Sequence, residues 1–210
     1  MNHYDDKYFE WQKSMGLLGA RLNKFMFEKH VTPNDRLLDF GCGGGFLLSE
    51  LNAGEKIGVE INPAGRENAL KLGINTVESL AGVQDEWATI AISNHALEHV
   101  DQPLDVLKEL SKKLKPKSKV IFVTPFERTN KYLENDINFH LYTWSPMNIG
   151  NLFNKAGFKV IKAHKVSHKW PPKFEILIKI LGFNAVHYLS RVYGFLNRSQ
   201  TQVRIVAQKF

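Results

Sequence analysis

The sequence is poor in several features that define other classes of protein. It has one cysteine, Cys42, among 210 residues, so an internal disulfide is excluded and a reducing compartment is favoured. It has no run of 18 apolar residues that would predict a membrane-spanning helix. Residues 1–6 are polar and acidic, unlike a signal peptide. Because repeats, low-complexity tracts and linkers are also missing, we expect residues 1–210 to form one cytoplasmic domain with its own core.

A glycine-rich stretch between two apolar runs is the most informative feature that is present. The first run ends at Asp39, and alternating glycines follow it: Gly41, Gly43 and Gly45. Glycine can adopt a positive φ and lets the backbone approach a ligand closely. Residues 46–51 then show helical periodicity, which would point free N–H groups at the loop. The second run ends at Glu60, whose carboxylate could accept both hydroxyls of a ribose, so this order predicts a nucleoside-binding βαβ unit.

The spacing of the glycines indicates which nucleoside is bound. A dinucleotide fingerprint, G-x-G-x-x-G, would need its third glycine at position 46, which is Phe46. Asp39 would also repel a pyrophosphate, whereas it suits a ligand that carries an ammonium and a sulfonium. The pattern present, D-x-G-x-G-x-G, resembles motif I of the class I S-adenosylmethionine-dependent methyltransferases. The same spacing disfavours an oxidoreductase.

The resemblance to this family extends over residues 35–165. Residues 87–94 look like its fourth strand. Residues 95–116 are similar to the "LEHV … LKEL … LKP" signature of the small-molecule branch, which contains quinone-biosynthesis methyltransferases. Residues 120–125 look like its fifth strand, and residues 140–158 look like its last helix and the start of its sixth strand.

The resemblance implies S-adenosylmethionine as the cofactor and assigns contacts to it. Glu60 would bind the ribose and Ile61 would stack on the adenine, near the segment that contains Ser79. Asn94 would lie close to the methyl group, and Cys42 would contribute its backbone. The implied cofactor-binding residues are Asp39, Gly41, Cys42, Gly43, Gly45, Glu60, Ile61, Ser79 and Asn94.

The alternation of strands and helices predicts an α/β fold. We expect a Rossmann-like, seven-stranded, mostly parallel sheet with helices on both faces. By the resemblance, the sheet would end in an antiparallel hairpin with strands at 159–163 and 201–207. Residues 1–34 would form an N-terminal helical cap across the mouth of the cofactor site.

The segment 166–200 departs from the minimal pattern of the family, because it separates the two strands of the hairpin. Two helices are predicted in it, at 173–181 and 185–196, and its charges are almost all basic. Three roles are open for this insert: packing on the sheet edge, a lid over the substrate, or peripheral contact with an anionic membrane.

The chemistry expected of such a site is mainly alignment. The enzyme would place the acceptor in line with the S–CH3 bond and exclude water, which can contribute roughly 7–11 kcal/mol. An acceptor hydroxyl or ammonium would also need a base, for which His95 and His140 are the candidates, with Glu98 beside His95. His95 and His99 are four residues apart, as metal ligands on a helix can be, but no third ligand is evident, so no metal is predicted.

Two other functions remain as alternatives. A net charge of +7 is compatible with nucleic acid as the substrate. However, the Asn/Asp-Pro-Pro-aromatic motif of base-amino methylation is missing after residue 93, and Cys42 is placed in the loop rather than as a nucleophile. A non-catalytic module that binds S-adenosylmethionine is the second alternative. The sequence favours methyl transfer to a small-molecule acceptor, apolar or lipid-linked because of the aromatic insert, and it predicts neither the atom methylated nor the oligomeric state.

Overall fold

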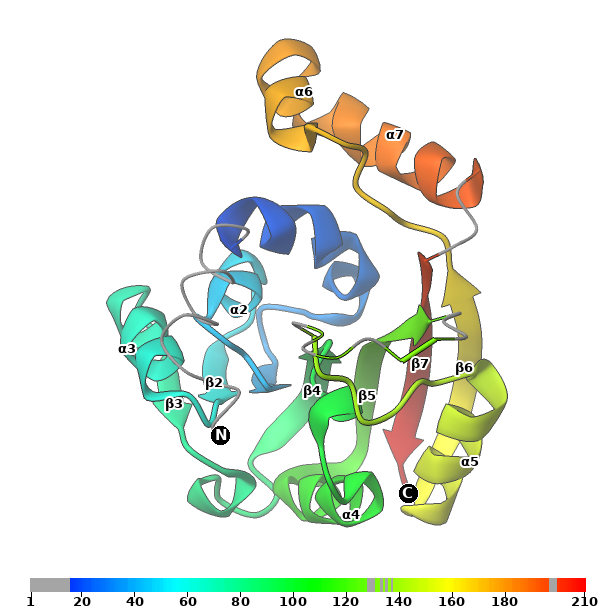
Figure 1. The fold of residues 1–210 in the computed structure, drawn as a ribbon. Coiled ribbons are helices and arrows are strands. Elements are labelled where there is room, and N and C mark those ends of the chain that lie inside the picture. The colour runs from blue at the N-terminus through cyan, green and yellow to red at the C-terminus, as the bar shows by residue number, and fades with distance from the viewer. Residues whose placement is uncertain (1–15, 128–130, 133, 135, 137, 197–199) are drawn as a thin grey trace.

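The computed structural model describes residues 16–127, 131–132, 134, 136, 138–196 and 200–210. Within them a seven-stranded sheet has the order β3-β2-β1-β4-β5-β7-β6 (Figure 1). The strands are β1 (Arg36–Phe40), β2 (Glu55–Val59), β3 (Asn75–Val77), β4 (Ala88–Asn94), β5 (Leu114–Glu127), β6 (Phe158–Val166) and β7 (Gln200–Lys209). Strands β1 to β5 are parallel, and β7 is antiparallel to both β5 and β6. The predicted fold class, including the closing antiparallel hairpin, is confirmed.

Helices cover both faces of the sheet. They are α2 (Phe46–Glu50), α3 (Pro63–Lys71), α4 (Pro103–Lys113), α5 (Pro146–Lys155), α6 (Phe174–Leu181) and α7 (Phe183–Leu196). Proline begins α3, α4 and α5, where its missing N–H costs nothing. Side-chain caps from Asn62 and Ser145 accept the first free N–H groups of α3 and α5.

The central strands are buried on both faces, as parallel strands covered by helices usually are. Along β5, Val120 and Phe122 belong to one core cluster, and Ile121 and Val123 belong to the other. The first cluster includes side chains of α4 and α5, and the second includes side chains of α2 and α3. Because successive residues of a strand point to opposite faces of the sheet, this alternation determines which side chains of β5 face each layer of helices.

The predicted N-terminal cap is seen only in part, because residues 1–15 lie outside the described residues. Residues 16–23 are α-helical, and two short 3-10 turns follow, η1 (Lys24–Met26) and η2 (Glu28–His30). The side chains of Met26 and Phe27 are fully buried in the core.

The predicted insert lies between β6 and β7 and contains α6 and α7 (Figure 1). It contacts the N-terminal helix, since Phe174 and Val186 form a separate cluster with Leu22. The insert therefore packs on residues 16–23. Of the three roles considered for it, packing on the sheet edge alone does not explain this contact. Over the described part of the chain, none of the helices is both long and apolar enough to cross a membrane.

Candidate functional site

The carboxyl ends of β1 and β4 meet at the point where the strand order reverses. Open α/β sheets form their ligand crevice at this point. A cavity of about 580 Å³ lies here. Its walls come from the N-terminal helix, the glycine loop, the turn after β4, the end of β5 with residues 138 and 140, residues 168–170 and Gln202.

The predicted site residues divide into two groups around this cavity. Some of them line it directly: Gly41, Cys42, Gly43, Asn94, His95 and His140. The others lie outside its wall: Asp39, Gly45, Glu60, Ile61 and Ser79. Ile61 is 64% exposed and Ser79 is exposed, so the adenine contacts assigned to them stay predictions.

The glycine loop takes the conformation that its sequence predicts. Gly41, Gly43 and Gly45 all have positive φ, at 72°, 53° and 77°. The N–H groups of Gly41 and Cys42 both donate to the carbonyl oxygen of Val59, at 2.8 and 3.1 Å, which ties the loop to β2. A Cβ on Gly41 would lie 2.3 Å from the Cβ of Ala96, so only glycine permits this approach of the loop to the turn after β4.

Glu60 stands beside the loop and holds it in place. Its carboxylate accepts hydrogen bonds from the N–H groups of Gly43 and Asn62, each at 2.8 Å. Because a carboxylate has about four acceptor positions, these two bonds leave capacity for ribose hydroxyls. The N–H of Glu60 donates to the carbonyl of Val77 at 3.0 Å, which brings the segment after β3 next to it. Burial raises the pKa of Glu60 above its ordinary value.

Asp39 and Cys42 are buried beneath the loop. Burial, and then the charge of Glu60, raises the pKa of Asp39 to about 8. Its Oδ1 accepts no hydrogen bond from the described residues. Burial also raises the pKa of the Cys42 thiol, and a Cβ on Gly58 would lie 2.3 Å from the Cys42 sulfur. Cys42 is therefore a buried packing residue and a poor nucleophile, as its place in the loop predicts.

The turn after β4 presents Asn94 and His95 to the cavity. His95 has a φ of 57°, and its N–H donates to the carbonyl of Val123 at 2.8 Å. A positive φ is uncommon for a non-glycine residue, and such residues cluster at functional sites. Burial lowers the pKa of His95 to about 4, so its ring is neutral at physiological pH.

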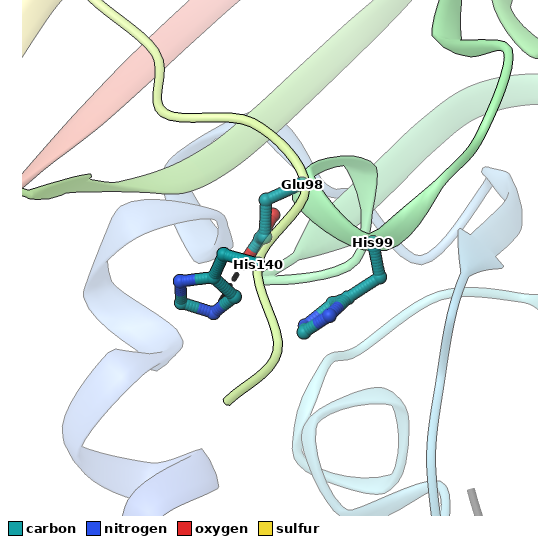
Figure 2. A group of neighbouring side chains, drawn as sticks. All are labelled: Glu98, His99 and His140. Atoms are coloured by element: carbon teal, nitrogen blue, oxygen red, sulfur yellow. Dashed lines mark ion pairs between the residues drawn. The ribbon is translucent and has the colours of Figure 1, made fainter. Parts of the chain in front are cut away.

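A second group of titratable side chains contains Glu98, His99 and His140, and its two histidines line the cavity (Figure 2). Glu98 is fully buried, and its Oε1 lies 3.9 Å from Nε2 of His140 (Figure 2). The same oxygen lies 3.5 Å from Nδ1 of His95. His140 in turn has its Nδ1 2.9 Å from Oε1 of Glu127. Burial raises the pKa of Glu98 to about 8, so this carboxyl is mostly protonated at neutral pH. The sequence did not identify Glu127 as part of this group, because only the path of the chain after β5 brings it to His140.

Three of these residues could share a divalent cation. One ligand atom each from Glu98, His99 and His140 lies within 4.8 Å of the others. The sequence offered His95 and His99 as a helical pair, but the 3-10 turn η4 (Leu97–His99) begins after His95, so the two are not on one helical face. His140 comes from a distant segment and is the donor that the sequence analysis lacked. Either a proton on Glu98 or a bound cation would neutralise the buried carboxylate. The absence of a metal therefore stays a prediction.

Comparison with known proteins bears on this site. A family model described as a methyltransferase domain matches residues 9–163. The ubiquinone biosynthesis O-methyltransferase of Vibrio cholerae is 30% identical over 125 residues, which cover 54% of this chain and 51% of that protein. The chain thus spans about half the length of the curated relatives that it matches.

Solved structures share the fold. A SAM-dependent methyltransferase of Thermotoga maritima has a TM-score of 0.67 at 21% identity, covering 96% of this chain and 95% of that one. The phosphoethanolamine N-methyltransferase 2 of Haemonchus contortus, in complex with S-adenosyl-L-methionine, has a TM-score of 0.68 at 15% identity, covering 99% of this chain and 58% of that one.

Proposed function

The chain belongs to the methyltransferase-domain family, and we propose that it transfers a methyl group from S-adenosylmethionine to a small-molecule acceptor. The single observation that carries this proposal is the hydrogen bond from the N–H of Gly43 to the Glu60 carboxylate. It holds a loop of three positive-φ glycines at the point where the strand order of the sheet reverses. The similarity to ubiquinone biosynthesis O-methyltransferases supports a small acceptor rather than a nucleic acid.

The residues at the site fit the cofactor. Glu60 would hold the ribose, because its carboxylate has free acceptor positions next to the loop. Asp39 fits the cationic end, because its Oδ1 accepts no hydrogen bond from described residues and a buried carboxylate is stabilised by a positive partner. When bound, S-adenosylmethionine supplies a methyl group that is already activated by its sulfonium.

The chain's own contribution would be orientation of the acceptor and removal of a proton. We infer an in-line displacement, for which the acceptor must be aligned and water excluded. His140 is the better candidate base: if its Nδ1–H donates to Glu127, its Nε2 is left as the proton acceptor. His95 is a weaker base, since its pKa is about 4, and it fits a positioning role at the end of β4.

The acceptor is apolar or lipid-linked in this proposal. Aromatic side chains from three segments line the cavity: Phe46, Phe126 and Trp170. Such walls favour a ring or an isoprenoid-like chain over a highly charged molecule. Trp170 belongs to the insert, so the insert contributes to the site as a lid would.

Calorimetric titration of S-adenosylmethionine and S-adenosylhomocysteine into wild type and Glu60→Ala tests this function. Loss of a charged acceptor should weaken binding by about 10- to 150-fold, or about 1.5–3 kcal/mol. Glu67→Ala is the control, because Glu67 is exposed on α3 and forms its ion pair with Lys71 of the same helix. Absence of binding by a folded wild-type sample would refute the enzyme and leave an interaction module. Binding that Glu60→Ala leaves unchanged would refute the role of Glu60.

A further inference from the structure

Helices α6 and α7 are apolar on two opposite sides. Their inner side is buried: Phe174, Val186, Ser190 and Gly194 face the N-terminal helix and residues 168–169. A Cβ on Gly194 would lie 2.8 Å from the backbone nitrogen of His168, which shows how closely this side packs. Packing against the rest of the chain therefore covers one side of each helix.

The other side faces outward, where the described residues do not cover it. We call it the outward apolar face, and its members are Ile176, Ile180, Leu181, Tyr188, Leu189, Val192, Phe195 and Leu196. Ile180 and Leu196 are each 72% exposed and Phe195 is 64% exposed. In α7 these side chains recur at helical spacing on the side opposite Val186 and Ser190. Figure 1 shows α6 and α7 standing clear of the sheet, on the outer side of the N-terminal helix.

The charges around this face are nearly all positive. Lys179 and Arg191 are exposed on the two helices, and Lys173 is exposed directly before α6. Glu175 is the only acid between residues 158 and 196. A second copy of the chain would bring these basic groups against one another, which is unfavourable. An anionic surface with an apolar interior would complement both the charge and the apolar side chains.

We propose that the outward apolar face of α6 and α7 docks on an anionic membrane, lying in the boundary between headgroups and acyl chains. Helices of 8 and 14 residues lie on such a surface rather than span it. The apolar row enters the acyl boundary, while Lys173, Lys179 and Arg191 contact the lipid phosphates.

Docking would place α6 and α7 between the membrane and the segment that lines the cavity. Residues 168–170, directly before α6, line the cavity wall. Trp170 also contacts the N-terminal helix, because a Cβ on Gly19 would lie 2.7 Å from its ring. The insert thus connects the docked face to the site. Docking itself does not depend on the proposed activity.

Vesicle co-sedimentation tests the proposal. Wild-type protein is mixed with vesicles of phosphatidylcholine alone and of phosphatidylcholine with 30% phosphatidylglycerol, at low and high salt. We expect binding to the anionic vesicles that high salt weakens. Ile180→Glu and Phe195→Glu should each weaken it by about tenfold or more, and Lys179→Gln and Arg191→Gln by about fivefold each.

Leu70→Glu is the matched control, since Leu70 is also 64% exposed but lies on α3. It should bind vesicles as the wild type does. Circular dichroism and titration with S-adenosylhomocysteine establish that each variant is folded, so failure of docking and failure of the cofactor site can be told apart. Folded wild type that stays in solution with anionic vesicles would overturn the proposal. So would equal binding by all variants, or a solution dimer that Phe195→Glu dissociates.

Discussion

Replacing Gly41 by alanine introduces a Cβ between the glycine loop and the turn after β4. The new atom would lie 2.3 Å from the Cβ of Ala96 and 3.7 Å from its Cα. Gly41 also has a φ of 72°, which alanine adopts only with strain. Two separate costs are therefore expected at this position, one from the backbone and one from the overlap.

Gly73→Ala isolates the backbone cost. Gly73 has a φ of 75°, but a Cβ there would meet nothing within 4 Å. The left-handed backbone should cost roughly 1–2 kcal/mol in both variants. The overlap with Ala96 should add about 1–3 kcal/mol in Gly41→Ala alone. The free energy of unfolding should then fall by about 2–5 kcal/mol for Gly41→Ala.

Urea denaturation of the wild type and both variants measures these losses, and thermal melts should show them as about 2–4 °C per kcal/mol for a chain of this size. Gly41→Ala should also weaken binding of S-adenosylhomocysteine, since Gly41 lines the cavity. Gly73→Ala should bind it as the wild type does. Equal losses of stability in the two variants would refute the reasoning, because the approach of the loop to Ala96 would then impose no constraint.

Two further predictions concern the buried carboxyls and the histidine group. The folded protein holds protons on Glu98 and Asp39 up to about pH 8, whereas their ordinary pKa values are 4.5 and 3.8. The stability that these two carboxyls contribute should therefore be fully present below about pH 4 and lost as the pH rises toward 8. The histidines His30, His95 and His168, whose pKa values burial lowers to about 4, act in the opposite direction below their ordinary pKa of 6.5. Denaturation of the wild type and of Glu98→Gln at a series of pH values isolates the contribution of Glu98, because the histidines are the same in both proteins. The variant should lose less stability than the wild type as the pH rises toward 8, and equal losses would contradict the protonated state of Glu98. For the predicted absence of a metal, dialysis against a chelator and addition of Mg²⁺ or Zn²⁺ should leave the melting temperature unchanged. A rise in melting temperature that His140→Ala abolishes would instead assign a metal to Glu98, His99 and His140.

The conformation of the glycine loop and the position of Glu60 beside it could be predicted from the sequence because their determinants are local. The glycine loop needs positive φ at fixed positions, and only glycine meets that need cheaply. Glu60 ends β2, so the pairing of β1 with β2 alone brings it to the loop. Both relations follow from β1, β2 and the loop that joins them.

The histidine group could not be predicted in the same way. Glu98 is an acid whose burial is decided by the packing of η4 under residues 140–142, where the N–H groups of Leu141 and Tyr142 donate to its carbonyl. The pairing of His140 with Glu127 depends on the path of the chain after β5. Side chains that meet through such long-range packing carry no fixed spacing in the sequence.

Part of the cavity wall, which would face the acceptor in the proposed function, is made by segments that the motifs do not cover. Gly16 and Gly19 of the N-terminal helix let it approach two aromatic rings: a Cβ on either would lie 2.7 Å from the ring of Phe46 or Trp170, respectively. Trp170 comes from the insert, beyond the resemblance at 35–165. Since the motifs fix only the cofactor side, two relatives with the same loop and the same Glu60 can present different walls to the acceptor. The choice of acceptor must therefore be sought in the N-terminal helix and residues 168–170, where substitutions should change acceptor preference and leave cofactor affinity intact.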